Sequence, residues 1–172
     1  TKQIAMRIEG FLSEKEGEFL YLVAKNCTGK GVIVEIGSWK GRSTIYLAKG
    51  SKAGNKIKIY AIDPHKGTKD HYDHNIFNTF NEFKNNLKEA NVEDIVIPIV
   101  KTSKEASKDW KKPIEFLWID GDHSFEMVKL DFLLWSPYLI DGGMIAFHDS
   151  VSGGPKEVIV KYVLRSNNFI NP

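Results

Sequence analysis

The feature that most constrains the fold of this chain is a buried strand that runs directly into a glycine turn and then a helix. Val32–Ile36 is a short, apolar and mostly β-branched run, which is typical of a parallel strand covered on both faces. Gly37 and Gly41 allow the backbone to turn sharply and a ligand to approach it closely. Ser43 then begins a helix whose free N–H groups favour an anionic or polar ligand. In parallel α/β sheets, nucleotide-like ligands bind at such a turn.

The spacing of the glycines narrows the choice of ligand. The dinucleotide-binding fingerprint requires G-x-G-x-x-G, whereas this chain has Gly37-x-x-x-Gly41. Ser38 and Trp39 stand where the second glycine would admit a pyrophosphate, which argues against NAD or FAD. Glu35, in the strand just before the turn, would repel a phosphate but can accept hydrogen bonds from the turn or from an ammonium group. The alternative is a tight turn that binds no ligand.

Length and charge bound the class of protein. The 172 residues suit a single domain, residues 1–172, with a buried core. The 24 basic and 22 acidic side chains give a net charge of +2, too balanced for a nucleic-acid-binding surface. A single cysteine, Cys27, predicts no internal disulfide. No apolar run approaches the roughly 20 residues of a membrane span, and no signal peptide is visible. We therefore expect a cytoplasmic protein that binds neither nucleic acid nor membrane.

Expected strands and helices alternate along the chain, which predicts a doubly wound α/β fold with a mostly parallel sheet. The capping box Ser13–Glu16 predicts an N-terminal helix over about 13–27, ahead of a core over about 31–165. The expected strands cover residues 32–36, 57–62, 95–100, 114–119 and 144–148. The expected helices between and after them cover about 43–49, 76–90, 104–110, 125–135 and 155–165. Right-handed crossovers place all strand ends on one edge of the sheet, where ligands bind.

Polar residues follow the second and third expected strands. A carboxylate at Asp63 can accept both hydroxyls of a ribose, and its alternative role is to cap the loop before Pro64. Ser103 can bond an adenine edge, or it can cap the helix that follows. The polar segment 65–74 is expected to be a long solvated loop at the binding edge, in which His71 and His74 have the spacing of a ligand pair.

The fourth and fifth expected strands deliver Asp120, His148 and Asp149 to the same edge, which predicts a divalent-cation site. Carboxylates suit Mg²⁺, Mn²⁺ or Ca²⁺, and a histidine shifts the preference toward Mn²⁺, Fe²⁺ or Zn²⁺. His123 is placed to take a proton from a substrate hydroxyl that a metal on Asp120 would hold. The alternatives are a capping aspartate, a core histidine, and a His123 that caps the helix beginning at about Phe125.

Four motifs occur in order along the chain, over roughly residues 13–150, in Val34–Ser43, Ala61–Pro64, Phe116–His123 and Gly142–Asp149. Together they resemble class I S-adenosylmethionine (SAM)-dependent O-methyltransferases. The most similar group is that of the cephalosporin-hydroxylase-like and macrolide-sugar O-methyltransferases. The resemblance implies a Rossmann-like fold. Because the chain ends at Pro172, we expect the sheet to lack the usual C-terminal antiparallel hairpin.

The resemblance also implies how SAM is held. Glu35, Gly37 and Trp39 match positions that line its methionine part, and Ser43 matches a position near its carboxylate. Asp63 matches the acid that holds the ribose. SAM would lie across the first two strands of the sheet, with its sulfonium directed toward the end of the fourth.

The third and fourth motifs carry the expected chemistry. Asp120, His148 and Asp149 match the metal-ligand positions of the metal-dependent members, with Asp120 also beside the cofactor. His123 matches the general base of the macrolide-sugar enzymes. His148 departs from the pattern, because those relatives usually carry an acid there.

The resulting hypothesis is SAM-dependent methyl transfer to a hydroxyl of a small molecule, assisted by Mg²⁺ or Mn²⁺. A non-catalytic SAM-binding or assembly module is the first alternative. An NAD-dependent oxidoreductase and a metal-dependent hydrolase are further alternatives, which the missing G-x-G-x-x-G and the missing nucleophile motif disfavour. The N-terminal helix and the Trp and Phe content are compatible with a homodimer.

Overall fold

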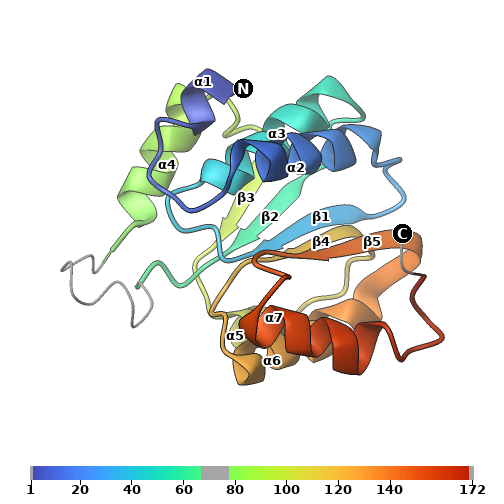
Figure 1. Cartoon of the computed structure of the whole chain (residues 1–172). Helices are drawn as coiled ribbons and strands as arrows, with labels where there is room; N and C mark the ends of the chain where they lie inside the picture. The colour runs from blue at the N-terminus through green and yellow to red at the C-terminus, as the bar shows by residue number, and fades with distance from the viewer. Residues whose placement is uncertain (1, 67–77, 171–172) are drawn as a thin grey trace.

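The computed structural model describes residues 2–66 and 78–170, and a five-stranded sheet lies at its centre (Figure 1). Its strands are β1 (Val32–Ile36), β2 (Ile59–Ile62), β3 (Val96–Ile99), β4 (Ile114–Ile119) and β5 (Leu139–Phe147). They follow the order β3-β2-β1-β4-β5, and every neighbouring pair is parallel. Strand order reverses between β1 and β4, which is the switch point where ligands bind in such sheets. The doubly wound α/β prediction is confirmed, and the described residues contain no antiparallel strand.

Helices cover both faces of the sheet (Figure 1). One face carries α1 (Lys2–Ala5), α2 (Glu14–Asn26), α3 (Arg42–Ala53) and α4 (Phe80–Glu89). The other carries α5 (Ser103–Ser107), α6 (Phe125–Trp135) and α7 (Gly153–Val158), with the 3₁₀ helix η2 (Ser136–Tyr138) and the π-helix η3 (Ile159–Val163). None of the described helices is long and apolar enough to cross a membrane.

Alternate side chains of each strand enter two separate apolar cores. Ile33 packs in the core beneath α2, α3 and α4, whereas Val34 and Ile36 pack in the core above α5 and α6. All six residues of β4 are buried, as expected for a central parallel strand. Glu35 shares the face of Ile33, so its carboxylate lies beneath α3.

Three local predictions were wrong. The helix after β1 does not end at Lys49 but continues to Ala53, because Gly50 packs against α2: a Cβ there would lie 2.1 Å from the carbonyl oxygen of Tyr21. The fifth strand, expected to begin at Met144, begins at Leu139, and residues 141–143 are a bulged part of it. The last helix begins at Gly153, so that Pro155 lies within its first turn rather than at its first position.

Candidate active site

The carboxyl ends of β1 and β4 meet in close contact, as the strand topology predicts. Gly37 has a φ of +87°, and a Cβ on it would lie 2.1 Å from the carbonyl oxygen of Asp120. The backbone N–H of Asp120 donates to the carbonyl of Ile36 over 2.8 Å. Only glycine combines this backbone conformation with so close an approach. Gly37 therefore sets the distance between the glycine loop, residues 37–41, and the end of β4.

Asp63, at the end of β2, caps the glycine loop. Its Oδ2 accepts the backbone N–H groups of Ser38 (3.0 Å) and Trp39 (2.8 Å), and its Oδ1 accepts that of His65 (2.6 Å). The capping role that the sequence left open is therefore real. A carboxylate has about four lone-pair sites, so acceptor capacity remains for a ribose hydroxyl. The ribose contact stays a prediction.

Glu35 and Ser43 contact each other directly. The carboxylate of Glu35 is fully buried and accepts the hydroxyls of Ser43 and Thr44, each over 2.5 Å. These bonds join β1 to the first turn of α3, beneath the glycine loop. Burial raises the pKa of Glu35 to about 8, even though the two hydroxyl donors favour the charged form. The predicted contacts of these two residues with SAM remain predictions.

The raised pKa of Glu35 predicts a pH-dependent stability. A carboxyl with a pKa of about 8 when folded and 4.5 when unfolded binds more protons in the folded state between those values. Its contribution is fully present below pH 4.5 and is lost as the pH rises to about 8. We expect Glu35 to lower the free energy of unfolding by up to roughly 1.4 kcal/mol per pH unit in this range, and Glu35→Gln to remove that part of the slope.

Urea denaturation at a series of pH values measures this slope. Glu115→Gln is the matched control, because the pKa of Glu115 is lowered by its bonds to backbone N–H groups and its titration falls below this range. An unchanged slope in Glu35→Gln would show that another group carries the pH dependence.

The N-terminal segment, residues 6–13, is bound to the start of α3, directly after the glycine loop, by Arg42. Arg42 donates from Nε to the carbonyl of Ile8 (2.7 Å) and from Nη1 to those of Gly10 (2.6 Å) and Leu12 (3.0 Å). This contact was not predicted, because nothing local in residues 6–13 marks them as a partner of α3.

Two further contacts attach the same segment. The rings of Phe11 and Trp39 stack with centroids 6.0 Å apart, although Phe11 remains 80% exposed. Lys40, only 8% exposed, binds Glu9 (2.7 Å) and Glu82 (3.1 Å). The N-terminal segment therefore forms a wall beside the expected cofactor site.

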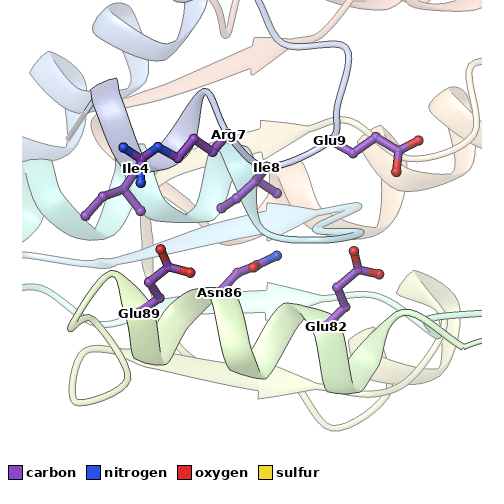
Figure 2. Close-up of a pocket in the computed structure, with 7 residues that line it drawn as sticks. All are labelled: Ile4, Arg7, Ile8, Glu9, Glu82, Asn86 and Glu89. Atoms are coloured by element: carbon purple, nitrogen blue, oxygen red, sulfur yellow. The ribbon is translucent and has the colours of Figure 1, made fainter.

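A surface hollow of about 220 Å³ lies between this N-terminal region and α4 (Figure 2). Ile4, Arg7 and Ile8 line one side, and Glu82, Asn86 and Glu89 project from α4 on the other. None of the residues predicted to bind SAM or a metal lines it, so this hollow carries no part of the predicted chemistry.

Ser103 contacts α6. Its hydroxyl donates to Asp131 and accepts the indole N–H of Trp135 over 3.0 Å. The cap of α5 is Thr102, so the capping alternative for Ser103 is wrong. Burial raises the pKa of Asp131 to about 6. The adenine contact of Ser103 stays a prediction.

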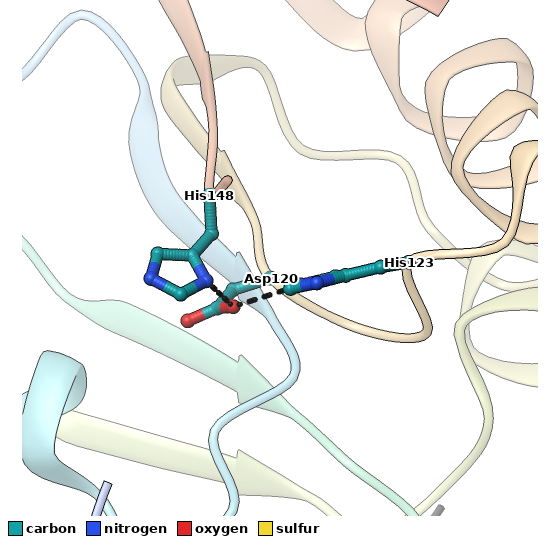
Figure 3. A group of neighbouring side chains, drawn as sticks. All are labelled: Asp120, His123 and His148. Atoms are coloured by element: carbon teal, nitrogen blue, oxygen red, sulfur yellow. Dashed lines mark ion pairs between the residues drawn. The ribbon is translucent and has the colours of Figure 1, made fainter. Parts of the chain in front are cut away.

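Asp120, His123 and His148 form one cluster (Figure 3). Asp120 Oδ1 lies 3.0 Å from His148 Nδ1 and 3.5 Å from His123 Nε2. Asp149 Oδ2 completes the group, 3.3 Å from His123 Nδ1 and 3.8 Å from His148 Nδ1. The end of β4, the loop before α6 and the end of β5 thus bring together all the residues for which metal or base chemistry was predicted.

The cluster fits a divalent cation. One ligand atom each from Asp120, His123 and His148 lies within 4.8 Å of the others. Both ring nitrogens of His148 are buried and make no hydrogen bond of normal geometry with the described residues. Burial alone would lower its pKa, but the carboxylates of Asp120, Asp149 and Glu16 raise it to about 9. The hydrogen bond to Asp120 likewise raises the pKa of His123. The carboxylates that favour protonated imidazoles also favour a cation bound in place of those protons.

Of the five non-glycine residues with a positive φ among the described residues, three lie at the same edge and two lie in the turns before β2 and β3. Trp39 (φ 40°), His65 (54°) and Asp149 (49°) are non-glycine residues in the left-handed region, a conformation that concentrates at functional sites. His65 is buried, with Nδ1 3.0 Å from Thr79 Oγ1. His71 and His74, which have the spacing of a ligand pair but were expected to be solvated, lie outside the described residues.

Comparison with known proteins agrees with this geometry. A family model described as a methyltransferase domain matches residues 34–150. The uncharacterised protein R132 of Acanthamoeba polyphaga mimivirus is 31% identical over 120 residues, which are 67% of this chain and 50% of that protein. The chain thus spans half the length of this curated relative.

Solved structures share the fold. The O-methyltransferase NovP superposes with a TM-score of 0.76 at 17% identity, over 88% of this chain and 72% of that one. An O-methyltransferase from Bacillus cereus, solved in complex with SAH, gives a TM-score of 0.63 at 22% identity, over 96% of this chain and 69% of that one. The family match runs from β1 through Asp149 and covers more than half of the sequence, so the chain belongs to the methyltransferase domain family.

Proposed function

We propose that this chain is a SAM-dependent O-methyltransferase that modifies a hydroxyl of a small molecule with the help of a divalent cation. The observation that carries the proposal is the convergence at one sheet edge of a glycine loop, its capping Asp63 and the cluster around Asp120. Methyl donor, acceptor and base must meet within bonding distance, and this edge is the place in the fold where the required groups lie together.

SAM supplies a methyl group on a positively charged sulfur. In the proposal it is held by the residues of the glycine loop and its supports, namely Glu35, Gly37, Trp39, Ser43, Asp63, Ser103 and Asp120. The free N–H groups at the start of α3 favour the carboxylate of its methionine part.

Asp120, His148 and Asp149 are the proposed metal ligands, and His123 is the proposed base. A divalent cation, when bound, lowers the pKa of a hydroxyl that it contacts. His123 is 39% exposed, so its imidazole can reach the proton of an acceptor hydroxyl at the open edge. The acceptor oxygen then forms a bond to the methyl carbon while the carbon–sulfur bond breaks, which leaves a neutral thioether.

Incubation with methyl-labelled SAM and a panel of catechols and hydroxylated sugars tests the proposal. We expect labelled product and S-adenosylhomocysteine in equal amounts, at a rate that falls with EDTA and returns with Mn²⁺ or Mg²⁺. Binding of SAM with no product from any acceptor would instead support a non-catalytic SAM-binding module. A titration with NADH in place of SAM is expected to show no binding.

Asp63→Ala is expected to weaken SAM binding about 10- to 100-fold. The substitution removes the predicted ribose acceptor and also two hydrogen bonds to the glycine loop, each worth about 1.5–3 kcal/mol because the acceptor is charged. Calorimetric titration with SAM measures the change. Asp63→Asn is the control, since it keeps one acceptor oxygen and should lose less. Wild-type affinity in Asp63→Ala would contradict the proposed cofactor position.

A further inference from the structure

We infer that Glu16 is a positioning residue, which orients the imidazole of His148 so that Nδ1 faces Asp120 and the cation site. This inference rests on the proposed function, because it concerns the same cation site. Glu16 lies in α2, outside the residues 34–150 that match the family model, and apart from its place in the capping box no predicted role includes it.

Two contacts hold the imidazole of His148 from opposite sides. Its Nδ1 lies 3.0 Å from Asp120 Oδ1, and its Nε2 lies 3.6 Å from Glu16 Oε1. The side chain is 4% exposed, and the ring of Trp118 packs edge-on against it with centroids 5.9 Å apart. Because water has so little access to the ring, these carboxylates dominate its electrostatic surroundings.

The capping box of α2 fixes the carboxylate of Glu16. Oε2 accepts the backbone N–H of Ser13 over 2.8 Å and its hydroxyl over 2.6 Å, while the backbone N–H of Glu16 donates to Ser13 Oγ over 3.3 Å. The cap therefore uses one carboxylate oxygen and leaves the other, Oε1, toward His148. The side chain of Glu16 therefore takes part both in the cap of α2 and in the contact with His148.

The orientation matters because a neutral imidazole has a single lone pair. When a cation takes the lone pair of Nδ1, the remaining proton is on Nε2, and the negative charge of Glu16 on that side of the ring stabilises this tautomer at a separation of 3.6 Å. Carboxylates that hold metal-binding histidines in this way raise metal affinity, and their loss typically weakens it 10–100-fold. Glu16 would thus support a histidine that stands where relatives usually carry an acid.

Glu16→Gln tests the inference sharply. Glutamine has only one side-chain oxygen, and the cap of Ser13 uses it, so the amide NH₂ group faces Nε2 of His148. A donor in that place favours the opposite tautomer. We expect Mn²⁺ affinity, measured by electron paramagnetic resonance of free Mn²⁺, to fall 10–100-fold, with circular dichroism unchanged. Nitrogen NMR of the labelled protein with Mg²⁺ is expected to show His148 protonated on Nε2 in the wild type and on Nδ1 in the variant.

Glu14→Gln is the matched control. It removes the same charge from the first turn of the same helix, but Glu14 pairs with Lys2 and does not face His148. Mn²⁺ affinity is expected to stay within about threefold of the wild type in this control. Glu16→Ala, which leaves no acceptor, is expected to weaken binding like Glu16→Gln.

The outcomes separate this inference from the proposed function. Wild-type Mn²⁺ affinity in both Glu16 variants would overturn the positioning role and leave the cation site intact. Equal losses in Glu16→Gln and Glu14→Gln would also overturn it, because they would reflect overall charge. No Mn²⁺ binding by the wild type would overturn the cation site and the inference together.

Discussion

Replacement of His123 by alanine is expected to slow methyl transfer about 10²- to 10⁴-fold while SAM and Mn²⁺ affinities stay unchanged. The imidazole lies between Asp120 (3.5 Å) and Asp149 (3.3 Å), yet it is the most exposed histidine ring of the cluster. Its loss therefore removes a proton acceptor without removing a contact that holds the fold. Single-turnover reactions with labelled SAM and an acceptor from the panel measure the rate of the transfer step.

Mn²⁺ affinity decides between two roles for His123. Its nitrogen also lies within 4.8 Å of the ligand atoms of Asp120 and His148, so the geometry permits it to be a fourth ligand. A loss of Mn²⁺ affinity that parallels the loss of rate would identify His123 as a metal ligand and contradict its role as base. His123→Gln is the companion variant, because it keeps a polar side chain of similar length but cannot accept the proton.

Gly37→Ala is expected to lower the free energy of unfolding by about 2–5 kcal/mol and to abolish SAM binding. An alanine Cβ would lie 2.1 Å from the carbonyl oxygen of Asp120 and 2.5 Å from its carbon, both backbone atoms that cannot move aside. The left-handed conformation at φ +87° adds about 1–2 kcal/mol, and the overpacking about 1–3 kcal/mol. Urea denaturation and calorimetric titration with SAM measure the two effects.

Gly29→Ala is the control that separates the cost of the left-handed backbone conformation from the cost of the steric clash at Gly37. Gly29 has nearly the same conformation, φ +91°, but a Cβ there would meet nothing within 4 Å. We expect this control to lose only the conformational part, about 1–2 kcal/mol, and to bind SAM normally. Equal losses in the two variants would show that β1 and β4 do not meet as closely as described.

Much of the fold could be predicted because its signals are local. The bounds of β1, β4 and α6 agree with the expected ranges to the residue, since each is a compact apolar run between polar turns. The gathering of Gly37 and Asp63 at one edge followed from topology, because parallel crossovers allow little choice of where strand ends lie.

The predictions that were missed or wrong depend on contacts between distant residues. Gly50 has the sequence mark of a turn, and only the backbone of Tyr21 against it explains why the helix continues. Glu16 was correctly predicted as a cap, but its second oxygen faces a histidine 132 residues away in the chain. The hydrogen bonds from Arg42 to the N-terminal segment could not be predicted, because no periodicity or motif in the sequence marks the residues that make them.

The stacking of Trp39 on Phe11 has a practical consequence. Of the four tryptophans in the sequence, Trp110, Trp118 and Trp135 are buried in the cores, whereas Trp39 is half-buried on the glycine loop. Its emission is therefore the part of the intrinsic fluorescence most sensitive to events at that loop. Ligand titrations can be followed by the tryptophan fluorescence of the unlabelled chain, with Trp39→Phe as the control that lacks the signal of the glycine loop.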